Sequence, residues 1–120
     1  MLNLDTHILV FALTDQLRPK ERDLLSRERW GISAIVLWEL AKLYQIGRIE
    51  LDLEAPEVVR ALSRIHVWPI DLAVCQKLRA LDFEGDPADE MIAATSIIHG
   101  APLVTRDSTI RKSKLVPLAH

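Results

Sequence analysis

The chain has 120 residues, of which 49% are hydrophobic and 27% are charged. This length and composition predict one folded domain over 1–120 and leave no room for a second domain of ordinary size. The 15 basic and 17 acidic side chains give a net charge of −2. This balance excludes a polycationic nucleic-acid binder, so any nucleic-acid binding must come from a local patch or from bound cations.

No stretch approaches the roughly 18 consecutive apolar residues that a membrane-spanning helix requires. The N-terminus also lacks the basic-then-apolar pattern of a secretory signal. The lone cysteine, Cys75, cannot form an internal disulfide, and on a helix at 72–81 it would share a face with Leu72 and Leu78. This face predicts a buried structural thiol. We therefore expect a cytoplasmic protein without membrane contact.

Strands and helices alternate in the first part of the chain. In chain order we expect a strand at 1–5, a helix at 7–13, a helix at 19–29, a strand at 30–33 and a helix at 34–46. Asp5 and Thr6 can cap the first of these helices, and Pro19 suits the first position of the second. Gly47 suits the position just past the end of the third helix.

The alternation continues to the end of the chain. We expect an extended segment at 49–53, a helix from 56 to about 65, a strand at 67–70, helices at 72–81 and 87–99, a strand at 103–105 and an edge strand at 115–116. Asp86, Pro87 and Gly100 mark the start and the stop of the longest helix. This order predicts an α/β fold with a central, mostly parallel β-sheet of about 4–5 short strands, flanked by helices on both faces.

Four aspartates stand where strands end or helices begin: Asp5, Asp86, Asp89 and Asp107. In a parallel sheet the carboxyl ends of the strands meet at one edge, where ligands bind. Helix capping is the alternative explanation, and for Asp86 taken singly it is the simpler one. Asp89 is less easily explained by capping, because two acids in one helical turn repel each other.

Glu39 is an acid that the fold does not obviously need. Its neighbours on the helix surface are the apolar residues Ile35, Val36 and Leu43, with Lys42 beside them. Burying a carboxylate on such a face is costly unless the group is paired, hydrogen-bonded or bound to a metal. The alternative is a half-exposed Glu39 that pairs with Lys42.

Carboxylate oxygens without accompanying His or Cys ligands favour a hard cation, Mg²⁺ or Mn²⁺. Such a site suits phosphodiester hydrolysis, because the cation activates the attacking water and stabilises the leaving oxygen. The sequence contains no P-loop, GxGxxG, HExxH, CxxC or nucleophile-elbow pattern. Its histidines are scattered and do not suggest the paired imidazoles of a metal-independent ribonuclease: His7, His66, His99 and His120.

Three segments carry a resemblance to a known family: LNLDTHILV at the N-terminus, ISAIVLWELAKL in the middle and GDPADEMIAATSIIHGAPLVTRD near the C-terminus. In this order and spacing the chain resembles the PIN-domain ribonucleases, specifically the VapC toxins of bacterial toxin–antitoxin pairs. The resemblance implies a PIN-like domain whose metal is bound by four acids: Asp5, Glu39, Asp89 and Asp107. It implies supporting roles for Thr6, Asp86 and Thr105. One position departs from the family, since relatives with this DPxD motif commonly have arginine where this chain has Glu90.

The resemblance further implies an Mg²⁺-dependent endoribonuclease, with Mn²⁺ as a substitute, that cuts a structured cellular RNA. It implies a cognate antitoxin protein that blocks the site, a homodimer, and a larger complex with the antitoxin. A small basic patch beside Asp107 is a predicted substrate-binding surface: Arg106, Arg111 and Lys112. Two alternatives stay open. One is a catalytically silent PIN domain that serves as an RNA- or protein-binding module, and the other is a DNA-directed metal nuclease.

Overall fold

A four-stranded parallel sheet forms the centre of the protein in a computed structural model that describes residues 1–119. The strands lie in the order β3-β2-β1-β4. Their bounds are β1 (Leu2–Leu4), β2 (Trp30–Ser33), β3 (His66–Trp68) and β4 (Leu103–Val104). Because β1 is an interior strand, Asp5, which follows it, emerges from the middle of the sheet at its carboxyl edge.

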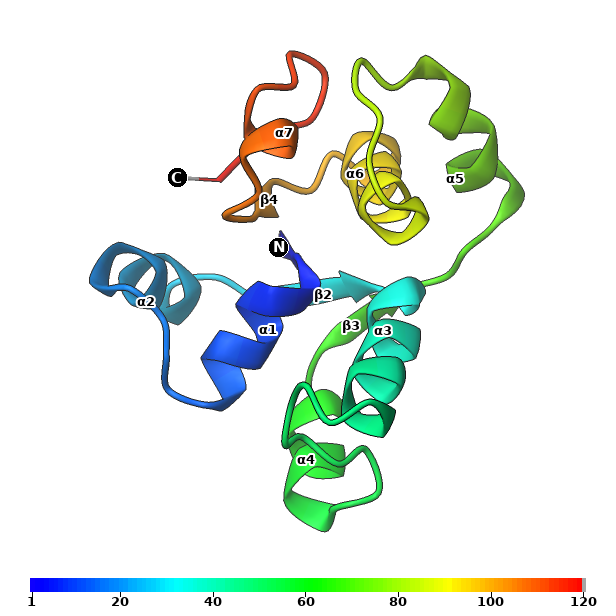
Figure 1. Cartoon of the computed structure of the whole chain (residues 1–120). Helices are drawn as coiled ribbons and strands as arrows, with labels where there is room; N and C mark the ends of the chain where they lie inside the picture. The colour runs from blue at the N-terminus through cyan, green and yellow to red at the C-terminus, as the bar shows by residue number, and fades with distance from the viewer. Residues whose placement is uncertain (120) are drawn as a thin grey trace.

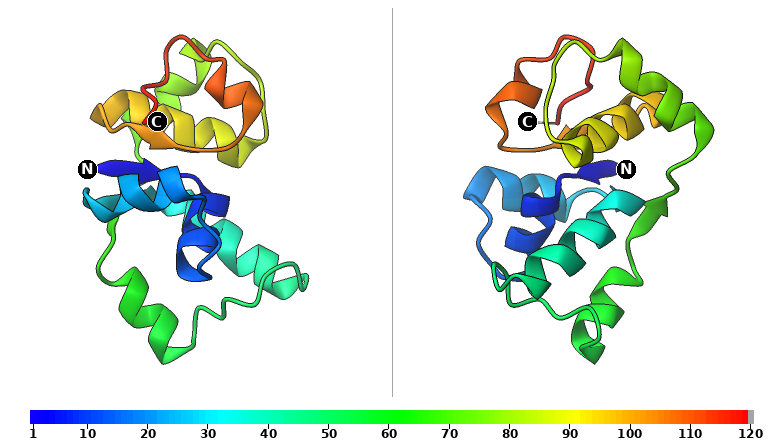
Figure 2. Two further views of the ribbon diagram at one scale, coloured as in Figure 1. Left: turned by 90° about the vertical axis from the view of Figure 1, so that its left-hand side faces the viewer. Right: turned by 45° about the vertical axis from the view of Figure 1, so that its right-hand side comes forward.

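Helices lie on both sides of this sheet, as the sequence predicts (Figure 1). Figure 2 shows α5, α6 and α7 on one side and α1, α2, α3 and α4 on the other. Their bounds are α1 (Thr6–Leu13), α2 (Pro19–Ser26), α3 (Ala34–Gln45), α4 (Pro56–Leu62), α5 (Leu72–Lys77), α6 (Pro87–His99) and α7 (Ser108–Arg111), with a 3-10 helix, η1 (Leu78–Ala80), after α5. The α/β prediction is confirmed. None of the helices formed by residues 1–119 is long and apolar enough to cross a membrane.

Strands β1, β2 and β4 are buried on both faces, which accounts for their apolar runs, whereas His66 and Val67 of the edge strand β3 are exposed. Leu4 of β1 and Leu103 of β4 are fully buried in the core. A polar contact adds to this packing, because Asn3 Nδ2 of β1 donates to Ile92 O (3.1 Å) and to Ser96 Oγ (2.8 Å) of α6. These bonds fix the position of α6 against β1, and so the position of Asp89 against Asp5.

The expected edge strand at 115–116 does not form, and the segment expected to be extended at 49–53 ends in a turn. The segment at 49–53 pairs with no strand, and Asp52 Oδ1 accepts from the backbone N–H of Glu54 (2.9 Å) in a turn. The segment at 115–116 is also outside the sheet, because Ser113 Oγ accepts from both of its backbone N–H groups (3.1 Å each). Leu118 instead forms a parallel bridge to Leu103. Short polar side chains that bond to the nearby backbone thus override the apolar pattern.

Several helices end earlier than the sequence predicts. The helix expected at 19–29 ends at Ser26, and the one expected to reach about 65 ends at Leu62. In both cases a serine hydroxyl at the end donates to a backbone carbonyl three residues earlier, Ser26 to Asp23 and Ser63 to Arg60 (both 2.7 Å). The helix expected at 72–81 changes to a 3-10 turn after Lys77.

Cys75 is exposed, so the predicted buried thiol is wrong. Leu72, on the same side of α5, is 73% exposed, whereas Val74 is buried. The helix is only six residues long, and Asp71 Oδ1 fixes its start by accepting from Val74 N–H (3.0 Å). So short a helix packs along one side only. The packed side is that of Val74, and the apolar residues that share a face with Cys75 did not identify it.

Gly31 of β2 faces the indole ring of Trp68 on the neighbouring strand β3. A Cβ atom at Gly31 would lie 2.6 Å from two carbons of that buried ring. We therefore expect Gly31→Ala to lower the free energy of unfolding by about 1–3 kcal/mol, measured by urea unfolding with tryptophan fluorescence. Gly85→Ala is the matched control, because the nearest atoms to its Cβ would be at 3.6 Å. Equal unfolding midpoints for the two variants would contradict this packing argument.

Candidate active site

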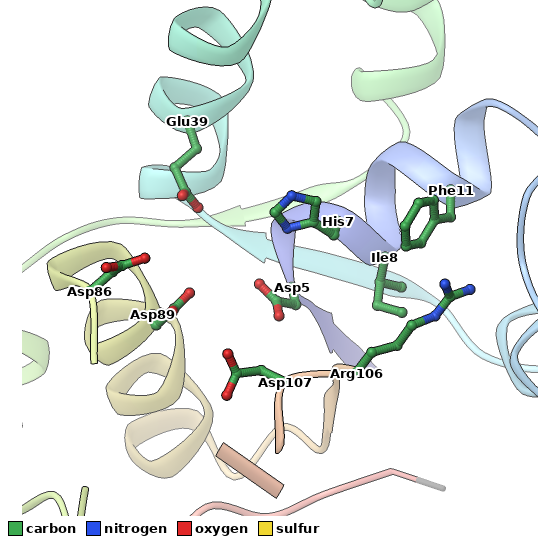
Figure 3. A pocket seen from close by; sticks show the side chains of 9 residues that line it. All are labelled: Asp5, His7, Ile8, Phe11, Glu39, Asp86, Asp89, Arg106 and Asp107. Atoms are coloured by element: carbon green, nitrogen blue, oxygen red, sulfur yellow. The ribbon is translucent and has the colours of Figure 1, made fainter. Parts of the chain in front are cut away.

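Five carboxylates line one pocket of about 410 Å³ at the carboxyl edge of the sheet. They come from the end of β1, from α3, from the start of α6 and from the loop after β4: Asp5, Glu39, Asp86, Asp89 and Asp107. Figure 3 shows all five side chains directed towards one shared space, with the guanidinium of Arg106 turned away from them towards Phe11. The structure therefore brings together every acid that the sequence singles out.

Asp5 is the most firmly held of these acids. It is 7% exposed, its Oδ1 accepts from Thr6 N–H (2.8 Å) at the start of α1, and its Oδ2 accepts from Thr105 Oγ1 (2.6 Å). Burial raises the pKa of Asp5 above its usual value, while these hydrogen bonds oppose the rise. Asp5 is thus both a helix cap and a pocket residue, so the two interpretations of its position are compatible.

Glu39 reaches from α3 to the start of α1, where its Oε1 accepts from the hydroxyl of Thr6. Among residues 1–119 it forms no ion pair with Lys42, so the surface-pair alternative is wrong. Burial raises the pKa of Glu39, and the charges of Asp5 and Asp86 add to the rise. Thr6 therefore connects two acids, through its backbone N–H to Asp5 and through its hydroxyl to Glu39.

Asp89 has the most perturbed carboxyl group of the pocket. Burial is the largest cause, followed by the charges of Asp5, Asp86, Asp107 and Glu39, and together they raise its pKa from 3.8 to about 7. No cation of the described chain compensates it. The raised pKa of Asp89 therefore reflects its burial together with repulsion from the other acids, which stays unrelieved in the metal-free protein.

Asp86 occupies the N-cap position of α6, but its side chain accepts no hydrogen bond from the helix. Capping therefore does not explain why the carboxylate of Asp86 faces the pocket. Glu90, the departure from the family pattern, does not line the pocket. Its Oε2 instead accepts from Gly85 N–H (3.1 Å), which turns it back onto the loop before α6.

Asp107 contributes to the pocket and also caps α7, because its Oδ1 accepts from Ile110 N–H (3.0 Å). The backbone N–H of Asp107 donates to Thr105 Oγ1 (3.0 Å), and that hydroxyl donates to Asp5. Thr105 is buried between the two acids. Thr6 and Thr105, for which the family resemblance implies supporting roles, thus hold the acids in place through their hydroxyl groups and do not line the pocket themselves.

The donor atoms suit a hard divalent cation, since five carboxylates line the pocket with one imidazole, that of His7, beside them. A cation there would also relieve the repulsion that raises the pKa of Asp89. Among residues 1–119, however, no three His, Cys, Asp or Glu groups are gathered closely enough to hold a metal ion as they stand. Asp5 is fixed by its hydrogen bonds and Glu39 is bonded to the hydroxyl of Thr6, so the half-exposed Asp89 is the group that would turn to complete a site.

The predicted substrate-binding cations have different environments. Arg106 lines the pocket, but Glu21 engages its guanidinium through two bonds (2.9 and 2.7 Å), and Phe11 lies 4.1 Å beneath it. Arg111 donates to Thr105 O (3.1 Å) and lies outside the acidic pocket. Lys112, also outside this pocket, is exposed.

Sequence reasoning missed three residues at this site: His7, Phe11 and Glu21. His7 and Phe11 line the pocket from α1. They lie four residues apart, so they share one face of the helix that follows Asp5-Thr6, and this spacing was the signal available in the sequence. Of the other histidines, His66 and His99 pack against Trp68 at 5.0 and 5.4 Å between ring centroids. His120 lies outside the described residues. No two imidazoles of residues 1–119 line the acidic pocket.

Comparison with known protein families assigns this domain, with its parallel sheet and its acids at the carboxyl edge, to a family. The PIN domain model matches residues 3–114, so the chain belongs to the PIN-domain family. Over 88 residues it is 34% identical to ribonuclease VapC22 of Mycobacterium tuberculosis, with 70% of this chain and 67% of that protein covered. The resemblance to VapC ribonucleases is thereby confirmed.

Solved structures share the fold. VapBC2 of Rickettsia felis, bound to a DNA fragment from its promoter, matches with a TM-score of 0.74 at 22% identity, covering 99% of this chain and 98% of that one. FitAcB of Neisseria gonorrhoeae matches with a TM-score of 0.72 at 23% identity, covering 100% and 97%. A toxin–antitoxin complex of Klebsiella pneumoniae matches with a TM-score of 0.71 at 20% identity, covering 93% and 91%.

Proposed function

We propose that this chain is an Mg²⁺-dependent endoribonuclease, the toxin of a toxin–antitoxin pair, and that residues 1–120 act as one PIN domain. The observation that carries the proposal is the convergence of five carboxylates on one pocket, where burial and the charges of the other four raise the pKa of Asp89 to about 7. The 34% identity to a VapC ribonuclease supports RNA as the substrate. Mn²⁺ is expected to substitute, because it accepts the same oxygen ligands.

Four acids would hold the cation: Asp5, Glu39, Asp89 and Asp107. When bound, it would lower the pKa of the attacking water and stabilise the leaving oxygen of the phosphodiester. The chain itself supplies orientation. Thr105 holds Asp5 and Thr6 joins Asp5 to Glu39, so that two of the acids are preset before substrate arrives. Asp86 adds negative charge at the rim in a supporting role.

Asp89 is the acid whose protonation changes near neutral pH. With a pKa of about 7 it carries a proton in much of the metal-free protein near neutral pH. Asp89 must release this proton to bind a cation, so binding is expected to weaken as the pH falls below 7.

An antitoxin partner is part of the proposal. The Klebsiella relative was solved as a toxin–antitoxin complex, and the relatives from two other bacteria were solved as VapBC complexes with DNA. We further propose a cytoplasmic homodimer that forms a larger complex with its antitoxin.

A catalytically silent PIN domain that only binds RNA or protein is the second candidate. The presence of all four acids in one pocket argues against it. A silent domain would have no need for an Asp89 whose charge is destabilised by burial and by its neighbours.

Cleavage is expected to require Mg²⁺ or Mn²⁺ and to stop when a chelator is added. Incubating the purified protein with total RNA tests this, followed by mapping of the ends. We expect 5′-phosphate and 3′-hydroxyl ends, because an activated water attacks and not the ribose 2′-hydroxyl. Cyclic 2′,3′-phosphate ends that persist in chelator would instead implicate a histidine mechanism. Cleavage of DNA but not RNA would favour the DNA-directed alternative.

A further inference from the structure

A second, basic pocket lies beside the acidic one. It has a volume of about 630 Å³ and is lined by four cationic side chains and one acid: Arg18, Lys20, Arg106, Arg111 and Glu21. Arg106 lines both pockets. The two cavities therefore meet at this side chain, although their charges are opposite.

The positive charge of this basic pocket is largely uncompensated. Glu21 neutralises Arg106 through the two-bond ion pair. Arg111 donates to the neutral carbonyl of Thr105 and so keeps its charge. Among residues 1–119 neither Arg18 nor Lys20 forms an ion pair, and both are exposed. Four cations against one acid leave a net positive charge in the basic pocket, with the charge of Glu21 acting on Arg106 and also on Arg18, in a chain whose net charge is −2.

The acidic pocket cannot by itself attract a polyanion. Its five carboxylates repel phosphate groups, and a bound divalent cation would compensate only part of their charge. An RNA strand whose scissile phosphate lies in the acidic pocket must place its neighbouring phosphates on the surrounding surface. Arg106 and Thr105 separate the acids from the basic pocket, since Thr105 lines the basic pocket and its hydroxyl donates to Asp5. The basic pocket is thus the adjoining surface that favours phosphate.

We propose that the basic pocket, with Arg18 and Lys20 as its free cations, binds a backbone phosphate of the RNA strand beside the bond that is cut. The proposal rests on the proposed function and adds the site that holds the substrate. Arg111 completes the pocket, while Arg106 serves as the wall between the two subsites and not as a free phosphate ligand. Of the cations predicted from sequence, only Arg111 therefore keeps a direct role, and two residues of the α2 region join it.

The test measures binding of a fluorescein-labelled single-stranded RNA dodecamer by anisotropy in EDTA, so that no cleavage occurs. Lys20→Glu and Arg18→Glu are compared with Arg60→Glu, which makes the same charge change on α4, outside both pockets. We expect the two pocket variants to weaken binding about tenfold and Arg60→Glu less than about twofold. The slope of log K against log salt should become shallower by about 0.7 in each pocket variant.

Lys20→Glu is expected to fold normally, since Lys20 lies in the first turn of α2, where an acid is favourable. A dodecamer with a neutral methylphosphonate at the contacted linkage should bind the wild type as weakly as the normal dodecamer binds Lys20→Glu. It should also abolish the difference between the two proteins. Inorganic phosphate and a deca-glutamate peptide serve as competing anions, and neither should displace the dodecamer efficiently.

Equal RNA binding by all three charge-reversal variants would overturn the proposal. So would deca-glutamate binding that depends on Lys20 where RNA binding does not, which would assign the pocket to an acidic protein segment. RNA cleavage by the wild type in Mg²⁺ is measured separately. Pocket-dependent binding without any cleavage would overturn the nuclease and support this site, whereas cleavage without a Lys20 effect would do the reverse.

Discussion

Replacing Glu39 by Gln or Asp89 by Asn is expected to abolish RNA cleavage while the fold remains intact. Each amide keeps the shape of the side chain and removes the charge that holds a cation. A bound cation contributes several kcal/mol to the transition state, so we expect losses of about a thousandfold or more. Initial rates on one RNA at saturating Mg²⁺, with circular dichroism to check folding, measure the effect.

Asp5→Asn should lose activity to the same degree. Its fold is also expected to persist, because the remaining oxygen can accept from Thr6 N–H and the Thr105 hydroxyl can rotate to accept from the new amide. Asp86→Asn is the matched control at the rim, and a milder loss is expected because its carboxylate is exposed and makes no hydrogen bond to the helix. Full activity in Glu39→Gln would show that this carboxylate serves only as the acceptor for Thr6.

The order of the elements and the parallel sheet were predictable because they depend on local signals. Pro87 and Gly100 set the limits of α6, and Gly100 adopts the left-handed conformation expected at a helix end, with φ of 61°. The convergence of the acids followed from topology, since carboxylates at strand ends of a parallel sheet share one edge. These features need no knowledge of which side chains touch.

Particular side-chain contacts were not predictable. Arg106 and Glu21 are 85 positions apart, and nothing local indicates that a cation beside the acids is already neutralised. The exposure of Cys75 depends on which side of a short helix meets α6. The lost strand at 115–116 depends on one serine hydroxyl that accepts two N–H groups. In each case a side-chain contact, and not the hydrophobic pattern, decides the outcome.

Asp89→Asn is also expected to stabilise the metal-free protein, and to do so only above acidic pH. The folded-state pKa of Asp89 is about 7, whereas its ordinary value is 3.8, so the folded chain holds this proton more tightly than the unfolded chain. The contribution of Asp89 to stability is therefore complete below pH 4 and is lost as the pH rises from about 4 to 7. Above pH 7 the ionised group is a constant destabilising charge.

A shift of this size would correspond to about 4 kcal/mol, but the group is half-exposed and solvent screens it. We therefore expect Asp89→Asn to raise the free energy of unfolding by about 1–2 kcal/mol at pH 8, a rise in Tm of about 4–10 °C. The two proteins should converge as the pH falls towards 4. Thermal unfolding in EDTA at several pH values measures the difference, with Asp71→Asn, at the start of α5, as the control for removing an aspartate outside the site.

Two further conditions distinguish this electrostatic effect from a change in packing. High salt should reduce the gain from Asp89→Asn, because screening weakens repulsion between partly exposed charges. Mg²⁺ should raise the Tm of the wild type more than that of Asp89→Asn, since the cation relieves the same repulsion and the variant has lost a ligand. A gain that stays constant from pH 4 to pH 8 and does not respond to salt would assign the stabilisation to packing. Neither burial nor the four acids around Asp89 would then raise its pKa.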